Sequence, residues 1–342
     1  MKKGSWKTFS EQAGPMAAPR LFRRMAFFVL CGTIAGCGGD PLVSVGGLPQ
    51  ELEPADLLVF APHPDDEMLG CAGIIRQALS RGKRVKVALF TNGDGFPLWA
   101  SHVTHKAADR LGPEDYLELA RFRQHQSQTA LKALGGKPED LVFLGYPDAG
   151  LGQVYLARGP TSFQQKFTKK TETYGMAQQD YHTAIHGRAA SYTYESALAD
   201  VVEIIRAFRP GRVCVTNEAD THRDHQAAFR FVRDGVKAAG YQGAFDTYLI
   251  HGGPEWPWPR GNAPQFPFEA RQVKGVRNPL GVPWPPPRRV AISQEENRFK
   301  LAAIQAHSTH LAGAPPGPLA EELEWFESFV KSEEVFWPAD PK

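Results

Sequence analysis

Short apolar runs alternate with longer amphipathic segments along most of the chain. Apolar runs of this length, bounded by turn residues, are typical of β-strands that are buried inside a sheet. Five of them are predicted to be strands, at residues 56–61, 85–91, 141–145, 212–216 and 247–251. A buried sheet needs layers that cover it, and the segments between the strands are the candidates.

These intervening segments have the spacing of amphipathic helices. Gly82, Gly135 and Gly240 follow three of them and are typical of helix ends. The predicted helices span residues 65–81, 116–134, 195–208, 225–239, 294–307 and 319–331. The alternation predicts an α/β fold, Rossmann-like and doubly wound, with a mostly parallel sheet flanked by helices. We expect the active site at the C-terminal ends of the strands, where such sheets bind ligands.

Two segments interrupt the alternation. Residues 151–194 are polar and rich in Tyr, Gln and Thr, and we interpret them as an insertion. Residues 252–288 are rich in Pro and Trp, and we interpret them as an extended excursion. Trp256, Trp258 and Trp284 could form a wall that stacks on a sugar ring, or they could pack as a cover on the core.

The N-terminal part of the chain has the pattern of a targeting segment. Residues 1–36 join a basic stretch to an apolar run that is too short to span a bilayer. The run ends in Ile-Ala-Gly-Cys37, which resembles the lipobox of bacterial lipoproteins, with a plain secretory signal as the alternative. Residues 37–54 are interpreted as a tether and residues 55–342 as the main domain. A lipid on Cys37 would attach the protein to a membrane of the bacterial cell envelope, at the periplasmic face of the outer membrane.

Composition and charge narrow the classes of function. Of the 342 residues 42% are hydrophobic and 22% charged, which is ordinary for a globular protein. The formal net charge is +2, but residues 1–36 contribute +5, so the remainder carries about −3. This charge gives no electrostatic reason to expect nucleic acid binding. Cys71 and Cys214 lie in apolar surroundings and are expected to be free thiols, with a bridge between them as the alternative.

A cluster of ionisable residues follows the first predicted strand. The sequence His63-Pro64-Asp65-Asp66-Glu67 holds one imidazole and three carboxylates. Acids in the first turn of a helix are favoured by the helix dipole, but this does not account for the histidine or for three successive acids. A bound cation would offset the charge. His63 and Asp66 are three residues apart, so they can share a helix face and one ion.

A second cluster follows the fourth predicted strand, with the sequence Asp220-Thr-His222-Arg-Asp224-His225. It again places imidazoles three residues apart, with acids around them, at a strand-to-helix junction. Either cluster alone could be a solvated helix start. The two together, at the ends of parallel strands, predict one metal site. Catalytic zinc takes three protein ligands of these types and a water, which indicates a hydrolase.

Together the two motifs resemble those of the PIG-L (LmbE-like) N-deacetylases, which use zinc to remove acetyl groups from N-acetylglucosamine-type amino sugars. The resemblance continues through residues 91–95, Arg123, residues 144–148, residues 209–210 and residues 300–308. It covers residues 55–342 apart from the two interruptions. Two departures bear on substrate contacts: Arg223 stands where the family usually has Pro, and Gln126 where a Glu is common.

The resemblance implies a role for each residue of the two motifs. The implied zinc ligands are His63, Asp66 and His225. Asp65 would be the general base, and a protonated His222, oriented by Asp224, would lie beside the developing oxyanion. Spacing alone leaves open that His222 is a ligand and His225 is not. Fe²⁺ or Co²⁺ could occupy the same nitrogen and oxygen ligands.

Three further residues each have two interpretations. Asp148 could approach the substrate or form a turn, Arg123 could contact substrate oxygens or be a solvated helix residue, and His251 could line the pocket or be structural. The other histidines lack acids at ligand spacing and are set aside: His102, His105, His125, His182, His186, His307 and His310.

The implied reaction is removal of an N-acetyl group from an amino sugar or glycoconjugate of the cell envelope. One alternative is a zinc amidase or esterase that acts on a different acylated lipid or metabolite. Another is a non-catalytic, lipid-anchored glycan-binding protein. The presence of Asp65 and of all three implied ligands argues against the last, because a degenerate relative is expected to lose one of them.

Overall fold

The computed structural model describes residues 56–254, 256–270, 280–312 and 317–340, all within the unit Gly47–Lys342. The predicted signal segment, its lipobox cysteine and the predicted tether lie outside the described residues. None of the described helices is both long and apolar enough to cross a membrane.

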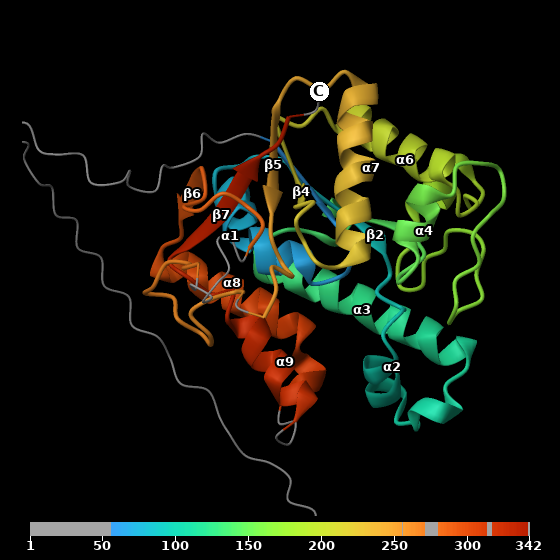
Figure 1. Ribbon diagram of the computed structural model, residues 1–342, viewed down its shortest axis with the longest axis horizontal. Coiled ribbons are helices and arrows are strands. Elements are labelled where there is room, and N and C mark those ends of the chain that lie inside the picture. The colour runs from blue at the N-terminus through green and yellow to red at the C-terminus, as the bar shows by residue number, and fades with distance from the viewer. Residues whose placement is uncertain (1–55, 255, 271–279, 313–316, 341–342) are drawn as a thin grey trace, which may run out of the picture. The chain divides into compact units, whose positions relative to one another are not determined.

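Within the described residues, seven strands form one sheet in the order β3-β2-β1-β4-β5-β7-β6 (Figure 1). The strands are β1 (Leu57–Ala61), β2 (Val85–Thr91), β3 (Leu141–Tyr146), β4 (Arg212–Thr216), β5 (Ala244–Tyr248), β6 (Arg288–Ala291) and β7 (Glu333–Pro338). The pairs among β1 to β5 are parallel, whereas β7 is antiparallel to both β5 and β6. The predicted fold class, a mostly parallel sheet flanked by helices, is confirmed.

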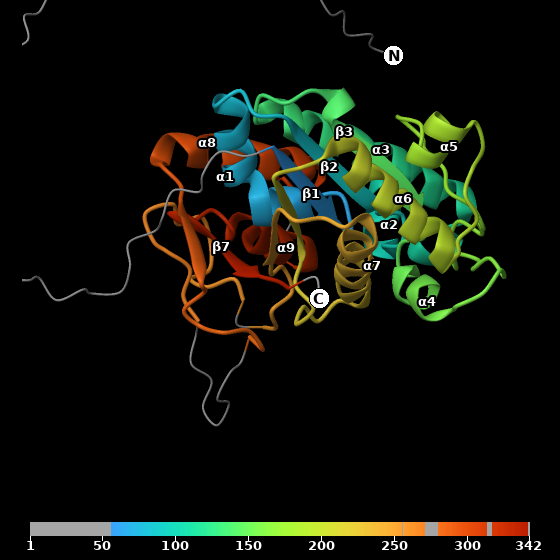
Figure 2. The same cartoon turned by 90° about the horizontal axis from the view of Figure 1, so that it is seen from above.

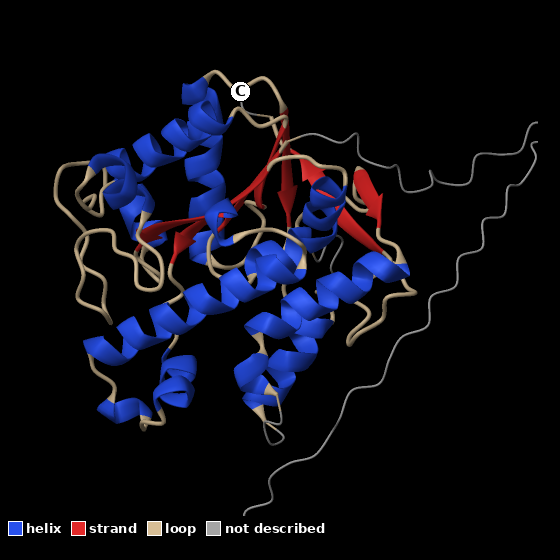
Figure 3. Ribbon diagram, turned by 180° about the vertical axis from the view of Figure 1, so that it is seen from behind, coloured by secondary structure: helices blue, strands red, loops and turns tan. Residues whose placement is uncertain are grey.

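The helices cover both faces of this sheet. They are α1 (Asp66–Ser80), α2 (Pro97–Thr104), α3 (Pro113–Ala133), α4 (Leu151–Leu156), α5 (Tyr181–His186), α6 (Tyr194–Phe208), α7 (Arg223–Ala239), α8 (Gln294–His307) and α9 (Pro318–Glu327). Side chains of β1 alternate between two cores: Leu57 and Val59 pack with α1, α3 and α8, and Leu58 and Phe60 with α6 and α7. Figure 2 shows α1 and α8 on one side of β1 and α7 on the other, and Figure 3 shows the same layers from behind.

The strand order explains why the two sequence motifs meet. The chain runs outward from β1 through β2 to β3 and then returns to β4 on the other side of β1. β1 and β4 are therefore neighbours, with Val59 aligned to Cys214. The loops that leave their carboxyl ends carry residues 62–65 and 217–222. Ligands bind at this kind of switch point in open α/β sheets.

The far edge of the sheet differs from the prediction. β5 ends at Tyr248 rather than at residue 251, so His251 lies in the loop that follows. β7 was not predicted, because it begins with two buried glutamates that break the apolar pattern. Glu333 pairs with Arg289, and Glu334 pairs with Lys300, so both charges are compensated.

The two interruptions contain more structure than their composition indicates. Residues 151–194 include α4 and α5, each of six residues, which is too short for a helical period to show. In the Pro/Trp-rich excursion Trp256 is buried, stacks on Phe268 and donates to the Leu249 carbonyl. Trp256 is therefore part of a cover on the core, and the prediction of a sugar-stacking wall is wrong for this residue.

Candidate active site

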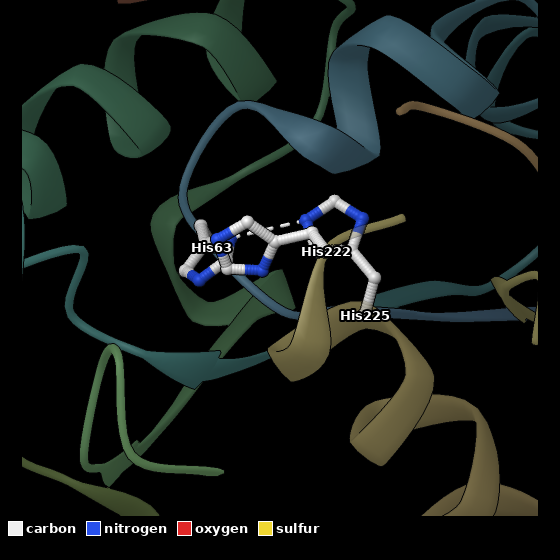
Figure 4. Close-up of side chains that lie close together, drawn as sticks. All are labelled: His63, His222 and His225. Atoms are coloured by element: carbon white, nitrogen blue, oxygen red, sulfur yellow. Dashed lines mark hydrogen bonds between the residues drawn. The ribbon is translucent and has the colours of Figure 1, made fainter. Parts of the chain in front are cut away.

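Three donor atoms from the two motifs meet beyond the carboxyl ends of β1 and β4. His63 Nδ1 lies 3.3 Å from Asp66 Oδ2, and His225 Nε2 lies 3.2 Å from each of these atoms. All three residues are buried, and Figure 4 shows the His63 and His225 rings facing each other. Donor atoms of a tetrahedral zinc site with bonds of about 2.0–2.1 Å stand about 3.3 Å apart. The implied ligand set therefore fits a zinc ion.

A carboxylate lies next to the second ring nitrogen of both His63 and His225, the one outside the three-atom cluster. Asp220 Oδ2 lies 3.0 Å from His225 Nδ1, and Asp148 Oδ1 lies 3.1 Å from His63 Nε2. Such pairs fix the orientation and tautomer of metal-binding imidazoles. Burial disfavours a charge on both rings, but the carboxylates outweigh it, raising the pKa of His63 well above its ordinary value and that of His225 to about 9. The surroundings thus favour positive charge at this point.

Asp65 stands beside the three donor atoms in a strained backbone conformation, with φ of 123°. Side chains rarely tolerate this region, and such strain is typical of functional sites. The Asp65 N–H donates to Glu67 Oε2 at 3.0 Å, and Arg123 Nη2 donates to Asp65 Oδ2 at 2.6 Å. Burial raises the pKa of Asp65 well above its usual range, while Arg123 opposes that shift. The site therefore holds a carboxylate next to the metal donors that is free to act as a base.

Arg123 is the residue that fixes this carboxylate. Its side chain is buried and also donates to the carbonyls of Pro64 and Gly93, so it fastens the loop that bears Asp65. The interpretation of Arg123 as a solvated helix residue is wrong. The sequence shows an arginine on an amphipathic helix, and only the packing of α3 against the loop after β1 turns it inward.

His222 forms the N-cap of α7, and its Nδ1 accepts the backbone N–H of Asp224 at 3.2 Å. A ring nitrogen that accepts a hydrogen bond is unprotonated, which leaves Nε2–H as the donor. Burial and the charges on His63 and His225 lower the pKa of His222 to about 4. The expectation of a protonated His222 stays a prediction, because His63 and His225 would not carry these charges as metal ligands.

Asp224 orients His222 through its backbone rather than its carboxylate. Asp224 Oδ1 accepts the backbone N–H of Gly152 at 3.2 Å, and Oδ2 lies 3.5 Å from His63 Nε2. The carboxylate thus supports the His63 ring together with Asp148. Asp148 and Asp224 thus both lie beside His63, and Asp148 also lines the adjoining pocket.

A pocket of about 290 Å³ opens onto the cluster and is lined by His63, Asp65, Asp66, Gly95, Phe96, Trp99, Arg123, Asp148, Ala149, His222, His251, Glu322, Trp325 and Phe326. Trp325 stacks on the His251 ring with centroids 5.1 Å apart, and Trp99 Nε1 donates to Glu322 at 2.9 Å. One wall is therefore aromatic with a carboxylate at its centre. This volume lies at the low end of small-molecule pockets.

Several site residues were missed from the sequence. Asp220 heads the second motif, and its position before His225 could have indicated an orienting role. The aromatic wall comes from α2 and α9, which tertiary packing brings to the pocket. Arg223 and Gln126, the two departures from the family pattern, were expected to affect contacts with the substrate. Neither is among the described residues that line the pocket. Gln126 instead donates to the His307 carbonyl at the end of α8.

Three further donor groups overlap the first. They are His63 with His222 and His225, Asp66 with His225 and His251, and His63 with Asp148 and Asp224. The alternative ligand role of His222 thus stays a prediction, available through its Nε2.

Comparisons with known proteins identify the family. The family model of PIG-L, described as GlcNAc-PI de-N-acetylase, matches residues 58–236. A 1D-myo-inositol 2-acetamido-2-deoxy-alpha-D-glucopyranoside deacetylase from Gordonia bronchialis is 36% identical over 115 residues, which cover 30% of this chain and 38% of that protein. The match thus spans well under half of that relative's length.

Two solved structures are similar in fold. The N,N'-diacetylchitobiose deacetylase from Pyrococcus horikoshii has a TM-score of 0.50 at 17% identity, over 84% of this chain and 85% of that one. A conserved protein from Thermus thermophilus has a TM-score of 0.45 at 21% identity, over 84% of this chain and 96% of that one. At these identities the likeness concerns the fold alone.

Proposed function

The chain belongs to the PIG-L family, and on that premise we propose that it is a zinc-dependent hydrolase that removes an N-acetyl group from an amino sugar or glycoconjugate. The observation that carries the proposal is the triangle of His63 Nδ1, Asp66 Oδ2 and His225 Nε2, beside an uncoordinated Asp65 in one pocket. The Gordonia relative named above is a deacetylase of such a glycoside, which supports the same class of substrate.

The metal, when bound, would polarise the acetyl carbonyl and lower the pKa of a water molecule. Asp65 takes the proton from the attacking water and passes it to the leaving amine, while Arg123 keeps its carboxylate in place. His222 donates its Nε2–H toward the carbonyl oxygen as negative charge develops there.

The residues that line the pocket favour a sugar as the substrate. Aromatic faces pack on the apolar faces of carbohydrate rings, and the half-buried Trp325 is an aromatic residue of the pocket lining. Glu322 of the same lining adds an acceptor for sugar hydroxyls. A pocket of about 290 Å³ would hold the group that carries the acetamide, with the rest of a glycoconjugate outside.

An acylated lipid or metabolite is the second candidate. Phe96 lines the pocket and Leu98 follows it on α2, and both side chains are more than a third exposed, at 38% and 40%. Apolar side chains at a pocket mouth would suit an apolar substituent next to the scissile amide. A lipid-linked amino sugar would satisfy both observations.

Acetate release tests the proposal. The purified protein, loaded with zinc, is incubated with N-acetylglucosamine oligosaccharides, N-acetylglucosaminyl inositols and N-acyl amino acids, and free acid and free amine are measured. We expect acetate and amine from the sugars. Release from the N-acyl amino acids alone would refute the amino-sugar proposal, and binding of glycans without release would support the non-catalytic alternative.

We further propose that the protein is anchored in the bacterial cell envelope through a lipid on Cys37, as the lipobox resemblance suggests. Cys37→Ser is expected to move the protein from the membrane fraction to the soluble fraction. Gly38→Ala is the matched control and should stay in the membrane fraction. Unchanged membrane association of Cys37→Ser would contradict the anchor.

A further inference from the structure

A second group of histidines and acids lies between α5 and α6, outside the active-site pocket. His182 and His186 are four residues apart on α5, and Asp200 and Glu203 are three apart on α6, so each pair shares a helix face. The two faces meet. His182 Nδ1 lies 2.7 Å from Asp200 Oδ1, and His186 Nε2 lies 2.9 Å from Glu203 Oε2.

His182, His186 and Asp200 are close enough to share one ion, and Glu203 adjoins them through His186. The rings of His182 and His186 have centroids 4.5 Å apart. One donor atom from each of His182, His186 and Asp200 lies within 4.8 Å of the others. Donors around a zinc ion stand about 3.3 Å apart, so small side-chain rotations would bring them to bonding distance.

The Asp200 carboxylate accepts a hydrogen bond from the main domain, as metal ligands commonly do. Asp200 is buried, and its second oxygen accepts the Tyr146 hydroxyl at 2.7 Å. A hydrogen bond such as that from Tyr146 orients a metal ligand.

We propose that His182, His186, Asp200 and Glu203 form a second site for a divalent transition metal, with zinc as the fitting ion. Two imidazoles and two carboxylates are a ligand set that zinc accepts in tetrahedral geometry. The ion takes the place of the protons that the two histidine–acid pairs now share. With four protein ligands the site has no position left for a substrate, so its role is structural.

The ion would fasten the inserted segment to the main domain. Residues 174–178 of this segment contact the loop after β2 and helix α3. The Tyr174 hydroxyl donates to Asp94 of the loop at 2.7 Å, and Gln124 of α3 accepts backbone N–H groups of residues 176–178. The Gly95 N–H of that loop donates to Asp148 at 2.6 Å. A metal between α5 and α6 would thus stabilise the loop after β2, which borders the active-site pocket, without taking part in the reaction.

Zinc stoichiometry of the full-length protein tests the proposal. The wild type is expected to bind two equivalents after removal of loosely held metal, and His182→Asn/His186→Asn one. His125→Asn, which changes an exposed histidine on α3, is the control and should bind two. One equivalent in the wild type, or equal stoichiometry in wild type and double variant, overturns the proposal.

Amide hydrogen exchange distinguishes loss of the second metal site from damage to the fold in the double variant. With a chelator present, the wild type and the double variant should melt at the same temperature. Addition of zinc should slow exchange in residues 172–190 of the wild type by about tenfold or more, and should leave the double variant unchanged. Equal slowing in both proteins would contradict the site. If the double variant melts lower in chelator, His186→Asn alone, at an exposed position, provides the same comparison.

Discussion

The protein contains two clusters of the same residue types, and only one has the surroundings that catalysis needs. The strand-end cluster consists of His63, Asp66 and His225, and the helix-face cluster of His182, His186, Asp200 and Glu203. In the first, three donor atoms from the loop after β1 and from the first turns of α1 and α7 lie within 3.3 Å of each other. In the second, each histidine already has its own carboxylate partner.

The difference lies in what adjoins the donors. Beside the strand-end cluster lies Asp65, whose carboxylate is outside the ligand set. Arg123 donates to this carboxylate, and the Asp65 backbone is strained, with φ of 123°. The strand-end cluster also opens into a pocket. The residues of the helix-face cluster occupy regular helices and all four are potential ligands. Imidazoles and acids in proximity therefore indicate a metal, and a strained, uncoordinated acid beside a pocket indicates a reaction.

Asp65→Asn gives the sharpest test of this contrast. Asparagine keeps the size and the hydrogen bond from Arg123 but is not a base, so kcat should fall by roughly 10²–10⁴-fold while the zinc content stays that of the wild type. Acetate release and metal analysis on the same preparation measure both. Asp109→Asn, at an exposed position, is the control and should keep full activity. Full activity of Asp65→Asn would show that Asp65 is not the general base.

Asp220→Asn probes the support of a ligand histidine. Asparagine can still meet His225 Nδ1 but carries no charge, so zinc affinity of the strand-end cluster should fall by roughly 10–100-fold. Competition with a chelating dye measures the affinity. Glu218→Gln, in the same loop and solvent-exposed, serves as the control. Equal affinities in the two variants would mean that Asp220 does not act on the metal through His225.

Trp325→Ala tests the pocket wall, where the expected effect is smallest. Loss of one aromatic contact of roughly 0.5–1.5 kcal/mol should raise KM for an amino-sugar substrate about two- to tenfold, with little change in kcat. Trp325→Phe should restore most of the affinity, since it keeps an aromatic face. A fall in kcat with an unchanged KM would place Trp325 in the support of His251 rather than in substrate binding.

The pattern of apolar residues predicted the centre of the fold because this pattern is local in the sequence. β2 and β4 have the predicted bounds. The ligand set of His63, Asp66 and His225 was implied by the resemblance of the two motifs to a family, and it stays a prediction. The rest of the fold depends on partners far along the chain. The buried charges of Glu333 and Glu334 concealed β7, because their compensation by Arg289 and Lys300 shows only in three dimensions.

The same reason explains what the spacing of residues did not reveal. His182 and His186 were set aside for lack of acids at ligand spacing, and the acids lie on another helix. The N-cap hydrogen bond of His222 and its two neighbouring imidazoles likewise arise only in the folded chain. The role of a residue can be predicted from sequence where it depends on neighbours within one turn of the chain. It cannot be predicted where it depends on side chains from another helix or strand.

An anomalous difference map from crystals of the zinc-loaded protein, measured at the zinc absorption edge, tests the central claim most directly. We predict a strong peak bonded to His63 Nδ1, Asp66 Oδ2 and His225 Nε2, with Asp65 and His222 outside bonding distance. A peak bonded to Asp65, or to His222 in place of His225, would contradict the assignment of ligands and base.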